Sequence, residues 1–214
     1  MSEKKISRRR FLGVLGVLGG GIAACGITGY IGTRFPHLEV PTSKCKDADG
    51  KRILVTYASR VGATLEVAEF IAAGLCKTGY AVDIEEVSAV RSLQGYAGVV
   101  LGSAIYMNKM LGAAINFLSD NQADLQQVPL ALFTTSLTMK DDTPENRQLL
   151  MEWTQPARDL VAPATEAAFG GVLNSQKLPF LYRLIISSMG EEDGDFRDWD
   201  AIQSWVDVLP AAFA

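Results

Sequence analysis

The stretch KRILVTYASRVGATLEVAEFIAAGL, residues 51–75, carries the pattern that decides the fold. Its first part, RILVTYA, is a run of β-branched and apolar residues typical of a buried strand. Its last part has the period of an amphipathic helix, with an apolar face formed by Leu65, Ala68, Ile71, Ala72 and Leu75. A short polar loop with one glycine joins the two parts. The stretch therefore predicts a strand, a loop and a helix in direct succession.

The same alternation continues along the chain. Further strands are predicted at AVDIEEV (81–87), GVVLGSA (98–104), VPLALFTTS (128–136) and TEAAFGGVL (165–173). Helices are predicted at 111–120, 143–161 and 196–209, the second with Thr143 as N-cap and Pro144 at its first position. Strands that alternate with helices predict a parallel sheet covered on both faces. We therefore expect an α/β fold with a doubly wound, five-stranded sheet in the order 2-1-3-4-5.

Composition and charge exclude several classes of protein. The chain has 214 residues with 21% charged and 48% hydrophobic residues, which is typical of one globular domain. Residues 1–12 hold five of the 20 basic and one of the 24 acidic residues, so the remainder carries a net charge of −8. An acidic body argues against a nucleic-acid binder. With three cysteines, no CxxC and one histidine, His37, we expect no metal site built on Cys and His.

The N-terminus has the features of an export signal. A basic segment runs into an apolar, glycine-rich stretch, and Ser7-Arg8-Arg9-Arg10-Phe11-Leu12 resembles the twin-arginine motif. An ordinary membrane anchor with a positive flank is the alternative. We expect an export signal or membrane anchor at residues 1–33, a linker at 34–50 and a domain at 51–214. The domain would then lie on the outer face of the cytoplasmic membrane or in the periplasm, associated with the membrane through the N-terminus.

The fate of this signal has three alternatives. The segment Ile22–Cys25 (IAAC) resembles a lipoprotein signal site, which would leave Cys25 lipidated. Cleavage without lipidation and an uncleaved anchor are the others, because the apolar run is near the roughly 20 residues that span a bilayer. Twin-arginine signals carry folded proteins, often with a cofactor already bound.

The polar loop of the opening stretch is a candidate phosphate site. It consists of Ser59, Arg60, Val61, Gly62, Ala63 and Thr64. Ligands of parallel sheets bind beyond the carboxyl ends of the strands, where backbone N–H groups and the positive end of a helix attract a phosphate. Gly62 allows close approach, the two hydroxyls can donate, and Arg60 either adds charge or points into water. A plain turn with a Ser/Thr cap is the alternative.

Two further loops should emerge on the same edge of the sheet. They are GSAIYMNK (102–109) and TTSLTMKDD (134–142). A flat aromatic ligand needs backbone polar groups at its ring edge and a large side chain over its face. Tyr106 is the candidate cover, or else a half-buried loop tyrosine. Three methionines, Met107, Met110 and Met139, either line the rim or pack inside.

With these three loops the chain resembles the flavodoxin-like proteins. A closer match is the menaquinone-dependent protoporphyrinogen dehydrogenase branch, which has a Ser/Thr-Arg-x-Gly-x-Thr loop, matched by residues 59–64. It also has a segment matched by VVLGSAIY (99–106) and a helix start matched by GDFRDWDAI (194–202). The resemblance covers about residues 51–210 and implies the three-layer flavodoxin-like fold.

The resemblance also implies a cofactor and a reaction. FMN would be held noncovalently, with its phosphate on residues 59–64. Its ring would contact Ser103, Ala104, Ile105 and Tyr106 in the second loop, and Thr134, Thr135, Ser136 and Leu137 in the third. The flavin would pass electrons between a substrate and a quinone or similar acceptor, so we expect no catalytic acid or base from the protein. An exported electron carrier between redox proteins and a flavin-free binding domain are the alternatives.

Two features stay open at the level of sequence. In LPFLYRLIISSMG (178–190) an apolar stripe is formed by Phe180, Leu181, Leu184 and Ile185. It packs in the core or faces a membrane or quinone. The sequence does not show whether Cys45 and Cys76 pair, and we expect Cys76 to be a small buried hydrophobe.

Overall fold

The computed structural model describes residues 45, 51–177, 180, 183–184 and 192–213. The chain divides into two compact units, Pro36–Asn174 with Glu192–Ala214, and Met1–Phe35 with Ser175–Glu191. The predicted export signal, the lipidation site Cys25 and most of the linker lie outside the described residues. Within the described part of the chain, no helix is both long enough and apolar enough to span a membrane.

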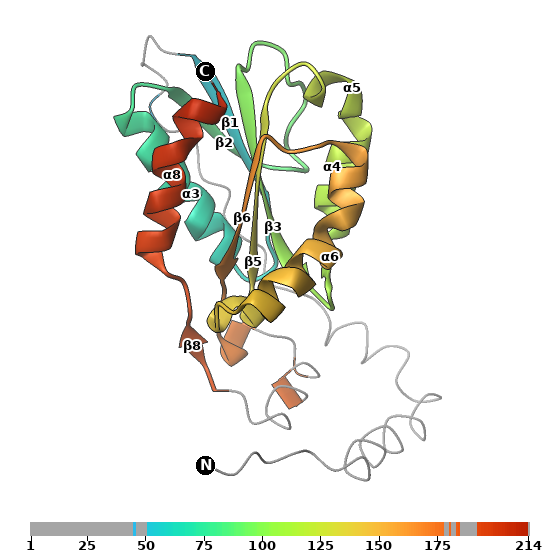
Figure 1. Cartoon of the computed structure of the whole chain (residues 1–214), viewed down its shortest axis with the longest axis vertical. Coiled ribbons are helices and arrows are strands. Elements are labelled where there is room, and N and C mark those ends of the chain that lie inside the picture. Colours follow the sequence, from blue (N-terminus) through green and yellow to red (C-terminus); the bar gives the residue numbers. More distant parts are fainter. Residues whose placement is uncertain (1–44, 46–50, 178–179, 181–182, 185–191, 214) are drawn as a thin grey trace. The chain divides into compact units, whose positions relative to one another are not determined.

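A parallel sheet forms the centre of the first unit (Figure 1). Its strands are β1 (Arg52–Ala58), β2 (Ala81–Glu86), β3 (Gly98–Tyr106), β5 (Leu130–Ser136) and β6 (Thr165–Gly170). They lie in the order β2-β1-β3-β5-β6, which confirms the predicted order 2-1-3-4-5. A two-residue strand that the sequence did not predict, β4 (Lys109–Met110), pairs antiparallel with β3.

Helices cover both faces of the sheet (Figure 1). The helices α3 (Ala63–Lys77) and α8 (Trp199–Ala212) pack on one face. The helices α4 (Gly112–Asp120) and α6 (Pro144–Leu160) pack on the other, with the short α5 (Gln122–Leu125) following α4. Each face has its own apolar core, so β1, β3 and β5 are buried on both sides. The Thr143 hydroxyl accepts from the Asn146 N–H, as the predicted N-cap of α6.

Close packing joins α3 to α8 beside the sheet. The period of α8 in the sequence predicts five inner residues, of which Ile202, Trp205, Val206 and Leu209 are buried and Trp199 is half-buried. A Cβ placed on Gly74 of α3 would lie 2.4 Å from Cγ1 of Val206. The glycine therefore lets the two helices approach closely.

The strand predicted at 165–173 is divided into two. After β6 the chain turns into β7 (Val172–Leu173), which pairs antiparallel with β8 (Gly194–Asp195). The close approach of another segment explains the break, because a Cβ on Gly170 would lie 1.9 Å from the Phe196 carbonyl oxygen. The pairing of β7 with β8 holds together the two ends of the segment between them.

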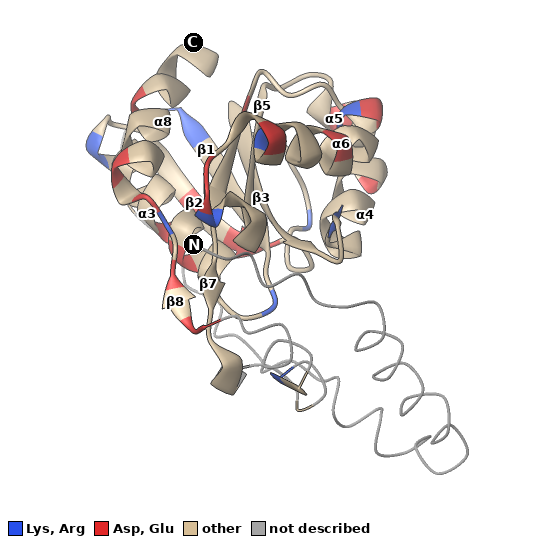
Figure 2. Ribbon diagram, turned by 60° about the horizontal axis from the view of Figure 1, so that its bottom comes forward, with Lys and Arg blue, Asp and Glu red and all other residues tan. Residues whose placement is uncertain are grey.

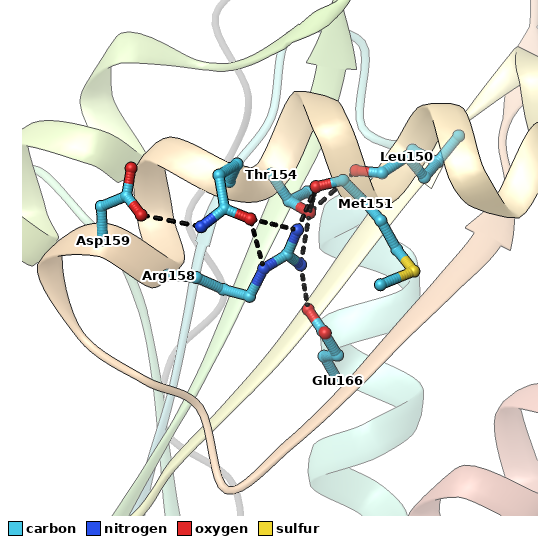
Figure 3. Close-up of polar contacts among 7 residues, drawn as sticks. Leu150, Met151, Thr154, Arg158, Asp159 and Glu166 are labelled. Atoms are coloured by element: carbon cyan, nitrogen blue, oxygen red, sulfur yellow. Dashed lines mark hydrogen bonds and ion pairs between the residues drawn. The ribbon is translucent and has the colours of Figure 1, made fainter.

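The edge strand β6 is tied to α6 by an arginine. Figure 3 shows the Arg158 guanidinium between the helix and Glu166 of β6. Its Nη1 lies 2.8 Å from the Glu166 carboxylate and 2.9 Å from the Thr154 hydroxyl, and its Nη2 donates to the Met151 carbonyl. These bonds fix the edge of the sheet against its covering helix.

Cys45 and Cys76 form a disulfide, with their Cα atoms 6.0 Å apart. Our expectation that Cys76 is a small buried hydrophobe was wrong, since it is half-buried and bonded to Cys45. The disulfide lies at the end of α3, beside the start of β2, and the Cys45 Sγ is 3.5 Å from the Tyr80 carbonyl oxygen. It is therefore at the amino edge of the sheet.

Candidate functional site

The register of the sheet aligns the ends of three strands. Ala58 of β1 pairs with Ser103 of β3, and Ser103 pairs with Thr134 of β5. The loops after β1, β3 and β5 therefore emerge side by side at the carboxyl edge. The predicted site residues of all three loops belong to this edge, as the topology requires.

The first loop turns sharply into α3. Gly62 has φ 100°, a left-handed conformation that favours glycine, and its N–H donates to the Ser59 hydroxyl over 3.1 Å. Among the described residues no side chain caps α3 or α4, whereas Thr143 caps α6 and Asp198 caps α8. The first amides of α3, those of Ala63 and Thr64, have no acceptor within the helix. This end of the helix is suited to an anion.

Two contacts connect the first loop to the other two. The guanidinium of Arg60 lies over the ring of Tyr106, 4.2 Å from its centroid. The hydroxyls of Thr64 and Thr135 lie 2.8 Å apart and share a hydrogen bond in the interior. Arg60 therefore reaches toward the second loop, and Thr64 ties the start of α3 to the end of β5.

The second loop is a tight hairpin between β3 and β4. Ser103 is fully buried, and its hydroxyl donates to the Ala104 carbonyl and accepts from the Leu111 N–H. The Ser103 side chain is therefore used in internal hydrogen bonds, so a ligand at this loop would bind its backbone groups. Ala104, Ile105 and Tyr106 are half-buried.

The hairpin tip has an unusual backbone. Met107 and Asn108 have φ values of 50° and 61°, which a two-residue turn of this kind requires. Met107 is 76% exposed at the tip, while Met110 and Met139 are buried and pack inside. Of the three methionines considered for the rim, Met107 alone is exposed.

The third loop begins inside the protein. Thr134, Thr135 and Ser136 are buried, and Leu137 is half-buried. The Ser136 hydroxyl accepts from the Thr138 N–H at the start of a 3-10 turn, Leu137–Lys140. The turn presents Leu137 and its backbone at the carboxyl edge.

The family of the chain follows from its sequence. A model of the flavodoxin domain matches residues 54–200, well over half of the chain. The chain belongs to the flavodoxin-domain family. This membership assigns the domain to flavin-binding electron transfer. No protein of curated function matches the sequence significantly.

The fold is shared with a solved flavodoxin, and further solved structures are similar to a lesser degree. A short-chain flavodoxin associated with a non-canonical PDU bacterial microcompartment is 14% identical, with a TM-score of 0.51 over 77% of this chain and 99% of that chain. The two-electron reduced flavodoxin of Megasphaera elsdenii is 18% identical, with a TM-score of 0.45 over 60% and 89%. An apo NADH:FMN oxidoreductase is 16% identical, with a TM-score of 0.47 over 76% and 88%. At such identities the first likeness shows the fold alone.

An arginine that was not predicted from the sequence connects α3 to β8 in the flavodoxin domain, beside the first loop. Arg197, with a side chain 7% exposed, bonds Glu66 in the first turn of α3 at 2.7 Å and Asp195 of β8 at 2.6 Å. It also stacks on Trp199, 4.6 Å from the ring centroid. The hydrogen bond from Arg197 lowers the pKa of Asp195, and the bond to Asp195 raises the pKa of Arg197. Arg197 thereby neutralises the negative charge of Glu66, which lies close to the candidate phosphate site.

A second missed residue supports the third loop. The Asn146 side chain of α6 donates to the carbonyls of Thr138 and Asp141, at 2.9 and 2.7 Å. A polar residue in the first turn of the helix after this loop is the one sequence signal that could have been used.

Proposed function

We propose that this chain is an FMN-dependent oxidoreductase that passes electrons between a substrate and a quinone or similar acceptor. One observation carries the proposal, namely the uncapped start of α3 behind Gly62, set between the ends of β3 and β5. FMN supplies the redox chemistry when bound. The protein would bind the phosphate with residues 59–64 and the ring with residues 103–106 and 134–137.

The donor set at this edge fits an anionic phosphate ester. The amides of Ala63 and Thr64, the hydroxyl of Ser59 and the positive end of α3 favour negative charge. Arg60 adds a cation, and Glu66 in the same turn is paired with Arg197. Tyr106 and the exposed Met107 would border the ring.

The link to a quinone is supported by the segment between β7 and β8. Both of its ends lie at the carboxyl edge, because the Gly171 N–H donates to the Ser136 carbonyl and the Phe196 N–H donates to the Gly171 carbonyl. Phe180 and Leu184 within it are 65% and 54% exposed. Residues 175–190 contain Lys177 and Arg183 and no acidic residue, and the acidic residues Glu191, Glu192 and Asp193 follow them. An apolar stretch that carries basic residues suits a membrane surface that holds a quinone.

We further propose that the domain works outside the cytoplasm, attached to the membrane through its N-terminus. The twin-arginine motif supports export, and the disulfide supports an oxidising compartment. An electron donor at the outer face then replaces the haem precursor of the protoporphyrinogen dehydrogenase branch, which is made inside the cell.

The second candidate is an electron carrier between redox proteins. Acidic residues lie on α3, on β8 and at the start of α8 (Figure 2). Asp198 and Asp200 are exposed, as are Glu66 and Asp195, which share Arg197 as their ion-pair partner. Such a surface would attract a partner with a basic face.

A two-part experiment tests these proposals. The absorbance spectrum of the purified protein, before and after addition of FMN, is expected to show bound flavin. A colourless protein that takes up no FMN would exclude both candidates and leave a flavin-free binding domain. Menaquinone and ubiquinone analogues are then offered to the reduced protein. Quinone reduction supports the oxidoreductase, whereas rapid exchange with a redox protein and no quinone reduction supports the carrier.

A further inference from the structure

The disulfide closes a covalent ring around one part of the domain. Its cysteines are 31 residues apart in sequence, and the ring contains β1, the loop at residues 59–62 and nearly all of α3. This part is the strand–loop–helix unit that carries the candidate phosphate site. The disulfide lies at its open end, and the loop lies at its closed end, on the opposite edge of the sheet.

Apolar contacts join the strand and the helix between these two ends. Ile53 and Val55 of β1 belong to the same buried cluster as Val67 and Ile71 of α3. If α3 separates from β1, these contacts are lost. The disulfide limits such separation, because it restricts the chain most strongly when the ring is unfolded.

We propose that the Cys45–Cys76 disulfide is a covalent closure of the β1–α3 unit, made by a thiol oxidant outside the cytoplasm. The part concerning location rests on the proposed export. The thiolate of one cysteine attacks a mixed disulfide formed on the other, and the protein loses two electrons and two protons. The oxidant's disulfide gains them and becomes two thiols. Both cysteines are half-buried, so an oxidant can reach them.

The effect on stability is tested with the full chain carrying Cys25→Ser, which removes the third cysteine. FMN-free protein is compared after reduction with dithiothreitol and after reoxidation with oxidised glutathione. Reduction is expected to expose two thiols to a maleimide-polyethylene glycol reagent and to lower Tm by roughly 4–16 °C. Reoxidation is expected to restore both values. The double variant with Cys45→Ser and Cys76→Ser is expected to have the low Tm with or without reductant.

Two results would overturn the closure. One is an unchanged Tm after complete reduction, and the other is failure of oxidised glutathione to protect the thiols. Neither measurement needs flavin, so the closure and the FMN proposal fail independently. FMN affinity is expected to change less than twofold on reduction, because the disulfide is on the opposite edge. A much larger change would contradict a closure that acts on the strand–helix unit without touching the ligand.

The location is tested by the redox state of the thiols in cells. Exported protein is expected to be oxidised, and a variant held in the cytoplasm by Arg8→Lys and Arg9→Lys is expected to be reduced. A disulfide in both compartments would overturn the role of an oxidant outside the cytoplasm. Reduced thiols in both would do the same, while the measurements on purified protein would stand.

Discussion

Gly62 combines two demands at the start of α3. Its φ of 100° makes the turn from β1, and its missing side chain leaves the helix end open to a ligand. Ser59 and Thr64 act within the protein as well, through the Gly62 N–H and the Thr135 hydroxyl. The loop is therefore shaped before a phosphate arrives.

We predict that Gly62→Val weakens FMN binding at least tenfold, because a side chain there obstructs the amides of α3. The strained backbone should also lower the stability of the apo protein by about 1–2 kcal/mol. Gly79→Val is the matched control, since Gly79 has φ 94° after the same helix but at the opposite edge, with open space around it. Isothermal titration with FMN and urea unfolding measure the two effects. If Gly62→Val and Gly79→Val lose FMN affinity equally, Gly62 is needed only for the backbone turn and not for binding FMN.

Tyr57 should make the domain sensitive to alkali. It is 1% exposed, its hydroxyl has no hydrogen-bond partner among the described residues, and burial, with Glu86 and Glu69 nearby, raises its pKa from 10.0 to about 12. A raised pKa gives stability that is complete below pH 10 and is lost as the pH rises through 12. We predict a loss of about 1 kcal/mol near pH 11 that Tyr57→Phe removes.

The comparison needs urea unfolding at pH 7 and pH 11 for both proteins. Tyr57→Phe should be as stable as the parent at pH 7, because it deletes an unsatisfied hydroxyl. Tyr96, whose pKa burial and Asp83 also raise to about 12, will leave a remaining loss in both. Identical pH dependence of the two proteins would show that Tyr57 does not contribute.

Among helices, the contact between α3 and α8 depends on a small residue. Gly74→Ala would usually strengthen a helix by up to about 1 kcal/mol. Here we predict a net loss of about 1–3 kcal/mol, because the new Cβ would lie 2.4 Å from Val206 Cγ1. Adding Val206→Ala should restore part of the loss. Gly112→Ala at the start of α4 is the control, since open space surrounds Gly112. Denaturant unfolding of the apo protein measures each change, and a stabilised Gly74→Ala would refute the close contact.

The elements with a strong periodic pattern could be predicted from the sequence. The runs at 52–58 and 98–104 are apolar and β-branched, and the helices between strands have clear apolar faces. The strands β4, β7 and β8 have two residues each, too short for any pattern. The strand β4 depends on the local turn at Met107 and Asn108, whose positive φ values the residue types do not indicate. The strands β7 and β8 depend on the approach of Phe196 to Gly170, which is a tertiary contact.

Some residues of the candidate site could likewise be predicted from the sequence, and others could not. Gly62 and the hydroxyls follow a strand directly, so local sequence could locate them. Arg197 bonds a residue 131 positions away, and Cys45 pairs across 31 residues. Such pairs have no local signal, because the fold brings them together.

At the scale of the whole molecule, the segment between β7 and β8 contains two exposed apolar residues, Phe180 and Leu184. We predict that Leu184→Asp leaves folding intact and weakens binding to anionic vesicles or reduction of a quinone several-fold, since Leu184 is 54% exposed. Val208→Asp, at an equally exposed residue of α8, is the control and should change neither. Circular dichroism and vesicle co-sedimentation test the pair. Loss of folding in Leu184→Asp alone would instead show that the stripe packs in a core.

The antiparallel pair of β7 and β8 has a consequence for how the length of the chain can change. Because the pair returns the backbone to its point of departure, residues 174–193 can be lengthened, shortened or exchanged without moving any strand of the parallel sheet. A change of length at this place therefore leaves the parallel sheet and the loops at its carboxyl edge unchanged. We expect that a short turn grafted between Leu173 and Gly194 yields a smaller protein that still folds.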